Sequence, residues 1–320
     1  MRLLRKSVFS DLRALPWTVP AVPLILLAAV VLVFVAPLTT LSAIWQTAPV
    51  GLVTVLIMLL LSVPLFLLPL WSARIGKQAS WAQAAPELTD IALALMLVGT
   101  LLSITMVALM LPRVGPFQYL DWNWQGKTLD MLWLLTLIVL LPGPLRRELG
   151  WQWRIYPGTG SAAAINIVLW GAIGFLITRQ GMFGDPVELA RTDLTLERLL
   201  FDISHPNLAE EILFRGLLLA VLDRVFRPNW TLFGARMGWG VIITAWLFGL
   251  AHGVAIDTES SLLTGTGSGL GITLDMAWLA QSFVMGLVLG WIRALTGSLW
   301  PAFLGHCAPE LGILLALSLY

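Results

Sequence analysis

Residues 208–216 read LAEEILFRG, which places two adjacent glutamates and an arginine in an otherwise apolar run. On a helix, Glu211 and Arg215 are four residues apart and share a face, so they can form an ion pair. Glu210 is turned about 100° away and has no such partner within the run. An unpaired carboxyl group in apolar surroundings has a raised pKa, which suits a general base working near neutral pH. The pattern predicts Glu210 as the reagent and Glu211 and Arg215 as its support. The plainer alternative is that all three only hold neighbouring helices together.

Two later stretches carry residues suited to the same chemistry. In AWLFGLAHG, Phe248 and His252 are four residues apart, and in GSLWPAFLGHCAPEL, His306 and Glu310 have the same spacing. Each pair therefore shares one face of its helix. A histidine inside an apolar segment needs a partner or a water-filled cavity. We therefore expect both stretches to face Glu210, whereas His205 is interpreted as a surface or capping residue.

These residues must be positioned by helices in a membrane, because the composition excludes a soluble domain. Of the 320 residues, 58% are hydrophobic and 12% are charged, whereas soluble domains have about 25% charged residues. The net charge of +1 argues against a nucleic-acid partner. The single cysteine excludes an intrachain disulfide and a cysteine-based zinc cluster. The predicted environment is a lipid bilayer.

Runs of about 20 apolar residues are long enough to cross the bilayer core. Seven strong candidates and two weaker ones, 128–145 and 207–223, are present. The strong candidates are 20–38, 49–71, 90–112, 161–178, 238–256, 273–292 and 297–318. The predicted fold is an all-α, polytopic transmembrane bundle of eight or nine spans that encloses an intramembrane polar cavity.

The basic residues predict how this bundle is oriented. With nine spans and a cytoplasmic N-terminus, 13 Lys and Arg residues fall on the cytoplasmic side and five on the other. This bias follows the positive-inside rule. The prediction is an integral membrane protein, with a prokaryotic inner membrane as the default location.

The chain is predicted to have three parts. Residues 1–180 form N-terminal transmembrane helices without a recognised motif, and 181–206 form an amphipathic interfacial segment. The helical core that carries the chemistry extends over 195–318 and contains the three motifs.

The order of these motifs resembles the CPBP family, which comprises CAAX prenyl endopeptidases and bacteriocin-processing or self-immunity proteins, also called the Abi family. The resemblance is carried by Glu210-Glu211-Arg215, then Phe248-His252, then His306-Glu310. The flanking sequences FRG and TGSLWPAFLGH are also similar to that family. Each motif alone is weak evidence, but three in order within membrane segments are fairly specific.

The resemblance implies an α-helical intramembrane endopeptidase. Glu210 would activate a water molecule, and His252 would hold and polarise it. His306 and Glu310 would stabilise the oxyanion, while Glu211 and Arg215 would hold the arrangement in place. Phe248 belongs to the same supporting set. The expected substrate is a peptide or a membrane protein, CAAX-like or of another kind.

One residue departs from the family pattern, which has asparagine or sometimes aspartate where this chain has Glu310. Asparagine offers an N–H donor to an oxyanion, whereas an ionised glutamate offers none. Glu310 could donate only if protonated, or it could serve as a metal ligand. The departure bears on activity more than on fold.

The preferred interpretation requires no cofactor, but a divalent metal such as zinc stays open. Two histidines and a glutamate, His252, His306 and Glu210, match the three-ligand pattern of catalytic zinc sites. Against this, the HExxH motif is absent and the ligands come from separate helices.

Two other function classes remain beside the protease. A catalytically inactive relative would act as a membrane scaffold or as a binding partner of another membrane protein. A proton-coupled transporter would use the same buried ionisable groups, but such carriers are usually built from two related halves, and this sequence has no detectable repeat.

Overall fold

The computed structural model describes residues 38–75, 86–141, 143–182, 184–257 and 271–320. Within these ranges the chain is mostly helical, with two short antiparallel hairpins and connecting loops. Five of the described helices are long and apolar enough to cross a membrane. The prediction of an all-α transmembrane fold is therefore confirmed, whereas the count of eight or nine spans stays a prediction. The expected span at 20–38 lies almost entirely outside the described residues.

The elements follow in chain order. The helices are α3 (Leu38–Ile75), α4 (Leu88–Met110), the 3₁₀ helix η2 (Gly115–Tyr119), α5 (Trp124–Leu140), α6 (Gly143–Glu148), α7 (Gly160–Arg179), α8 (Pro186–Asp193), α9 (Leu196–Asp202), α10 (His205–Glu211), η3 (Ile212–Leu218), α11 (Leu219–Val225), α12 (Trp239–Gly253), α13 (Met276–Thr296) and α14 (Trp300–Leu317). The strands are β1 (Trp230–Leu232), β2 (Ala235–Met237), β3 (Val254–Asp257) and β4 (Gly271–Leu274), and β1 pairs with β2 as β3 does with β4.

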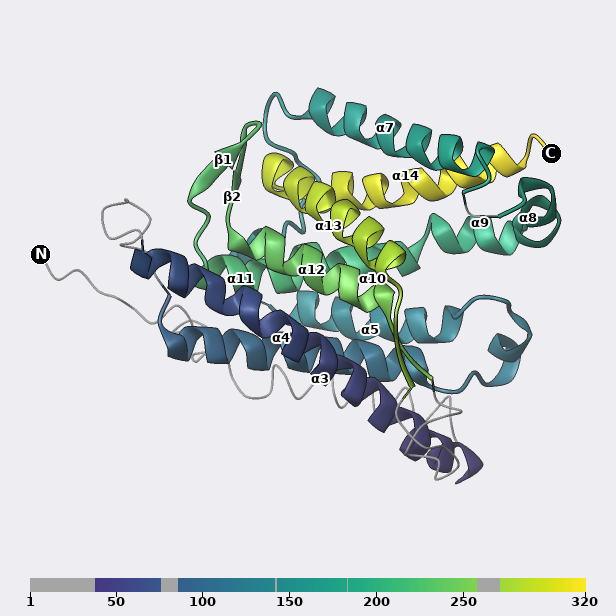
Figure 1. Ribbon diagram of the computed structural model, residues 1–320, viewed down its shortest axis with the longest axis horizontal. Helices are drawn as coiled ribbons and strands as arrows, with labels where there is room; N and C mark the ends of the chain where they lie inside the picture. The colour runs from purple at the N-terminus through teal and green to yellow at the C-terminus, as the bar shows by residue number, and fades with distance from the viewer. Residues whose placement is uncertain (1–37, 76–85, 142, 183, 258–270) are drawn as a thin grey trace, which may run out of the picture.

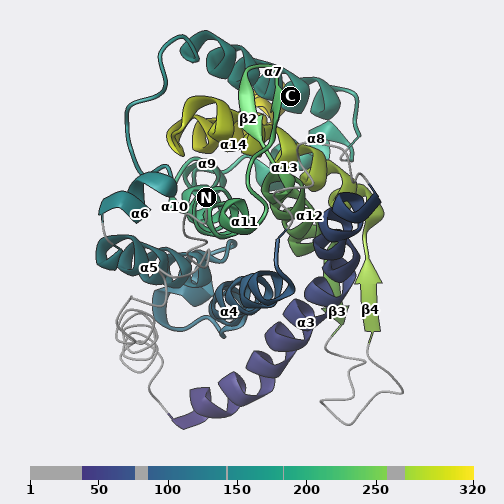
Figure 2. The same cartoon turned by 90° about the vertical axis from the view of Figure 1, so that its left-hand side faces the viewer.

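The long helices pack as neighbouring pairs around a central one. Helix α14 lies along α7, α12 lies along α13, and α3 lies along α4 (Figure 1). The view from the side shows α10 and α11 between the α4–α5 layer and the α12–α14 layer (Figure 2). Residues that are far apart in sequence therefore meet around α10.

The central helix runs without interruption through α10, η3 and α11. It begins after Ser204, with Pro206 in the first turn, where a missing N–H costs no helical hydrogen bond. Its middle part, Ile212–Leu218, is π-helical, and every side chain in that part is buried. Short π-helical stretches inside α-helices are frequent at functional sites. The motif of the two glutamates thus lies where the helix changes its winding.

Helices α7 and α14 approach closely because glycines face each other. A Cβ atom added to Gly174 would lie 2.8 Å from Cα of Pro309, and one added to Gly312 would lie 2.9 Å from the backbone N of Phe175. Small residues allow transmembrane helices to pack backbone against backbone. This packing fixes the part of α14 that carries His306 and Glu310.

The segment between α7 and α10 forms two short helices, α8 and α9. Asp185 caps α8 by accepting from the Val187 N–H, and Thr195 caps α9 by accepting from the Arg198 N–H. Glu197 anchors α9 to the loop before α5 by accepting from the backbone N–H groups of Asp121 and Trp122. The predicted interfacial segment is therefore fastened to the helix bundle at α9.

Candidate active site

Three side chains predicted to do chemistry converge from three helices. The Nε2 atom of His252 on α12 lies 3.7 Å from Oε2 of Glu210 on α10, and the Nε2 atom of His306 on α14 lies 3.8 Å from the same oxygen. This oxygen is buried and has no hydrogen-bond partner in the described part of the chain. One free carboxylate oxygen thus faces two imidazole nitrogens.

The other nitrogen of each imidazole is engaged by an acceptor. The Nδ1 atom of His252 lies 2.8 Å from the carbonyl oxygen of Phe248 one turn earlier, and Nδ1 of His306 lies 2.8 Å from Oε1 of Glu211. A carbonyl and a carboxylate oxygen can only accept, so both rings donate through Nδ1. Each neutral ring therefore presents the lone pair of Nε2 to Glu210, and each protonated ring presents an N–H.

Glu211 and Arg215 form the ion pair that their spacing favours. Arg215 donates to Oε1 of Glu211 over 2.9 Å, and both side chains are essentially unexposed, at 1% and 0%. The same Glu211 oxygen accepts from His306. A buried charge needs a partner and hydrogen bonds, and Glu211 has both. Its contacts with Arg215 and His306 also link the central helix to α14.

The ring of Phe248 lies at the centre of this support. The Arg215 guanidinium lies 4.2 Å from its centroid, within the range of a cation–π contact. The rings of His252 and His306 lie 4.4 and 5.6 Å from it. Phe248 is 1% exposed and therefore packs tightly against the Arg215 guanidinium and both imidazoles.

The expectation that Glu210 has no partner was wrong. Lys127, in the first turn of α5, donates to Oε1 of Glu210, and the side chains are 13% and 16% exposed. Lys127 lies just before the weak candidate span 128–145 and belongs to none of the three motifs. The partner comes from 83 positions away in the sequence, so helical spacing within the motif could not reveal it.

Glu310 was expected to face Glu210, but its nearest charged neighbour is Arg198. Its Oε2 atom is 3.8 Å from Arg198 on α9, and its side chain is 32% exposed. Arg198 also pairs with Asp193 and with Asp202, the latter at 3.3 Å. Among the contacts of the described residues, no hydrogen bond or ion pair joins Glu310 to Glu210 or His306. Arg198 is therefore the cationic neighbour of Glu310 at this side of the cavity.

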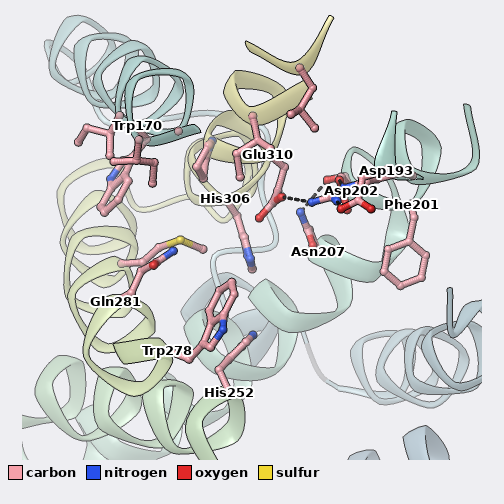
Figure 3. A pocket seen from close by; sticks show the side chains of 18 of the residues that line it. Trp170, Asp193, Phe201, Asp202, Asn207, His252, Trp278, Gln281, His306 and Glu310 are labelled. Carbon is pink, nitrogen blue, oxygen red and sulfur yellow. Dashed lines mark hydrogen bonds and ion pairs between the residues drawn. The ribbon is translucent and has the colours of Figure 1, made fainter. Parts of the chain in front are cut away.

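A cavity of about 820 Å³ contains the reacting groups. Figure 3 shows His252, His306 and Glu310 around it, with Trp278 of α13 beside His252 and Gln281 of the same helix to the left. Glu210 also lines it, whereas Glu211, Arg215 and Phe248 do not. Several polar lining residues belong to no sequence motif and were therefore not predicted: Asp193, Arg198, Asp202, Asn207 and Gln281. Its apolar lining includes Trp170, Ile173, Ile177, Met285, Ile313 and Leu317.

Two acidic residues of α9, on one side of the cavity, have shifted pKa values. Burial raises the pKa of Asp202, and the neighbouring Arg198 opposes this effect. For Glu197, desolvation raises the pKa but is outweighed by hydrogen bonds from Trp122, Asp121 and the Trp124 indole, which leave the pKa below its ordinary value. Glu197 thus acts as an ionised anchor for α9.

The donor types of Glu210, His252 and His306 suit zinc. Within the ranges that the structure describes, however, no group of three or more His, Cys, Asp and Glu side chains is arranged to hold a metal ion. The geometry does not fit a preformed three-ligand centre, so no chemical step below is routed through a metal.

Residues 194–311 match the family model of the Rce1-like type II CAAX prenyl endopeptidases. The matched region extends from α9 into α14 and includes all three motifs, so the resemblance expected from them is confirmed for this part of the chain. The matched family is a family of proteases, and the apolar helices make this chain an integral membrane protein. No curated protein and no solved structure gave a significant match.

Proposed function

We propose that this chain is an intramembrane endopeptidase that hydrolyses a peptide bond in a membrane-associated peptide or protein. One observation carries the proposal. The Oε2 atom of Glu210, which has no hydrogen-bond partner among the described residues, faces the Nε2 atoms of His252 and His306 in a cavity between apolar helices. A base, two polarising groups and a sheltered site are what hydrolysis by an activated water requires.

The first step is activation of water. A water molecule between Glu210 and His252 can hydrogen-bond to both, because donor–acceptor distances of 2.6–3.2 Å to each group are compatible with a gap of 3.7 Å between them. Glu210 takes one proton from the water through Oε2, and the remaining hydroxide forms a bond to the carbonyl carbon of the substrate.

The second step is stabilisation of the oxyanion. The π-electron pair of the substrate carbonyl moves to its oxygen, and the protonated Nε2 of His306 donates to that oxygen. The Nδ1 atom of the same ring donates to Glu211, which orients Nε2 toward the cavity. Glu210 then passes its proton to the leaving nitrogen, and the electron pair on the oxyanion re-forms the C=O bond as the C–N bond breaks. A carboxylic acid and an amine are released, and transfer of the remaining acid proton to the amine gives a carboxylate and an ammonium group.

Glu310 does not supply a donor in this scheme. Its Oε2 atom lies 3.8 Å from Arg198 at the side of the cavity, so the substrate oxygen is placed toward His306. The proposed reaction needs neither Glu310 as a reagent nor a metal ion.

The walls support an apolar, membrane-embedded substrate. Tryptophans of α7 and α13 and aliphatic residues of α7 and α14 line the cavity beside the polar groups. A CAAX-like substrate agrees with the description of the matched family. The excess of Lys and Arg on one predicted side supports a cytoplasmic N-terminus, and a prokaryotic inner membrane is the proposed default location.

A second candidate function is an inactive relative that binds other membrane proteins. The observation in its favour is the Glu310 carboxylate, which lies on the cavity without a donor to offer and would repel a nearby oxyanion. In that case Glu210 and His252 would be dispensable for the cellular phenotype.

The test is cleavage of a panel of membrane-associated peptides, prenylated and unprenylated, by the purified protein in lipid bilayers. The wild type is compared with Glu210→Gln and His252→Ala, each with and without a chelator. Cleavage that is lost in both variants and kept with chelator supports the proposal. A wild type that cleaves nothing, while Glu210→Gln and His252→Ala preserve the cellular phenotype, supports the inactive binding protein.

A further inference from the structure

We propose that Lys127 is a positioning residue for the reaction, which holds one oxygen of Glu210 so that the other faces the two imidazoles. The inference rests on the proposed function. Lys127 lies on α5, outside the region 194–311 that matches the protease family. The family likeness therefore assigns it no role.

Hydrogen bonds fix the position of the first turn of α5, which carries this lysine. Asn123 caps the helix by accepting from the Gly126 N–H and donates its amide to the Leu109 carbonyl at 2.7 Å. Gln125 donates to the Pro112 carbonyl at 2.8 Å and accepts from the Val114 N–H. These bonds tie the turn to the end of α4, so the backbone that carries Lys127 is fixed.

The next residue ties the same turn to the start of α10. The hydroxyl of Thr128 lies 3.1 Å from Nε2 of His205, while Lys127 donates to Glu210 near the other end of that short helix. Two consecutive residues of α5 thus hold α10 at two points. His205 is half-buried and lies outside the cavity lining, so only the Lys127 contact reaches the reacting groups.

The contact with Lys127 makes the two oxygens of Glu210 unequal. Oε1 accepts from Lys127, and Oε2 is buried beside the imidazoles without a hydrogen bond to any residue that the structure describes. Both side chains are mostly shielded from solvent, so the attraction between them is screened little. Without the lysine, either oxygen could turn toward His252 or His306, and the productive orientation would be one of several.

This role predicts an effect on turnover rather than on substrate binding. Lys127 does not line the cavity, and a group that acts only through Glu210 alters the step in which Glu210 takes a proton. Loss of such an interaction lowers kcat and kcat/KM together. A merely structural lysine would instead lower the amount of folded protein and leave the kcat of the folded fraction unchanged.

The test compares Lys127→Met with Lys127→Arg, which keeps a cation, and with Thr128→Val as the matched control on α5. We expect Lys127→Met to lower kcat by about 10–100-fold at nearly unchanged KM, Lys127→Arg to recover most of this loss, and Thr128→Val to stay near wild type. In a Glu210→Gln background, Lys127→Met should have no further effect. Equal kcat for Lys127→Met and wild type, or no recovery with Lys127→Arg, would overturn the inference.

A second measurement does not depend on cleavage. Thermal unfolding of the wild type, Lys127→Met, Glu210→Gln and the double variant in detergent forms a double-mutant cycle. We expect the double variant to lose less stability than the sum of the two single variants. Additive losses would overturn the inference. If the cycle shows that the two residues are coupled but the wild type cleaves no peptide, the contact is established and the proposed function is refuted.

Discussion

The Nδ1 atom of His306 donates a 2.8 Å hydrogen bond to Oε1 of Glu211. The second glutamate of the adjacent pair therefore orients a ring whose other nitrogen faces the first. Glu211 also pairs with Arg215, so this hydrogen bond connects the buried ion pair to the reacting imidazole of His306. A change in the buried ion pair should consequently alter both stability and turnover.

Arg215→Met should destabilise the protein by about 3–5 kcal/mol, because it leaves the buried Glu211 carboxylate without its cationic partner. Unfolding in a denaturing-detergent titration measures this loss. The double variant Arg215→Met/Glu211→Gln removes both charges and should recover part of the stability. If the double variant were less stable than Arg215→Met, the ion pair would not be the source of the loss.

Glu310→Asn should raise kcat, because it adds an N–H donor at the cavity and removes a negative charge near the oxyanion. A single donor to an oxyanion contributes up to about 10²–10³-fold in rate, and a side chain not positioned for this purpose should give less. Glu310→Ala removes the charge without adding a donor and separates the two effects. Steady-state kinetics on one peptide measures all three proteins, and a fall in kcat for both variants would show that Glu310 takes part in the reaction.

Glu197 should make stability depend on pH in the acidic range. Its pKa in the folded protein is below the ordinary value of 4.5, so the stability it adds is fully present above about pH 4.5 and is lost as the pH falls through the folded-state pKa. We expect wild type to have a higher Tm than Glu197→Gln at pH 7, and the difference to shrink below pH 4.5. A difference that is the same at pH 7 and pH 3 would show that the charge of Glu197 does not anchor α9.

The sequence predicted the parts of the site that depend on local spacing. Glu211 and Arg215 are one helical turn apart, as are Phe248 and His252, and such pairs share a face in any helix. The convergence of Glu210, His252 and His306 was expected because ionisable groups in apolar spans need partners. The five apolar helices followed from the lengths of their apolar runs.

Contacts between distant segments could not be predicted in this way. Lys127 lies next to a weak span and carries no motif, so its contact with Glu210 depends on how α5 packs against α10. Arg198 was assigned to an interfacial segment, yet α9 turns it toward Glu310. In both cases the partner of a carboxylate is set by packing between helices rather than by the period of one helix.

The central claim is that Glu210 activates a water molecule that becomes part of the product. The most direct measurement is cleavage of a peptide in water enriched in ¹⁸O, with mass spectrometry of both fragments. We predict one ¹⁸O atom in the new carboxylate of the N-terminal fragment, and a rate at least about 10²-fold lower for Glu210→Gln. A product without ¹⁸O, or equal cleavage by Glu210→Gln, would contradict the account.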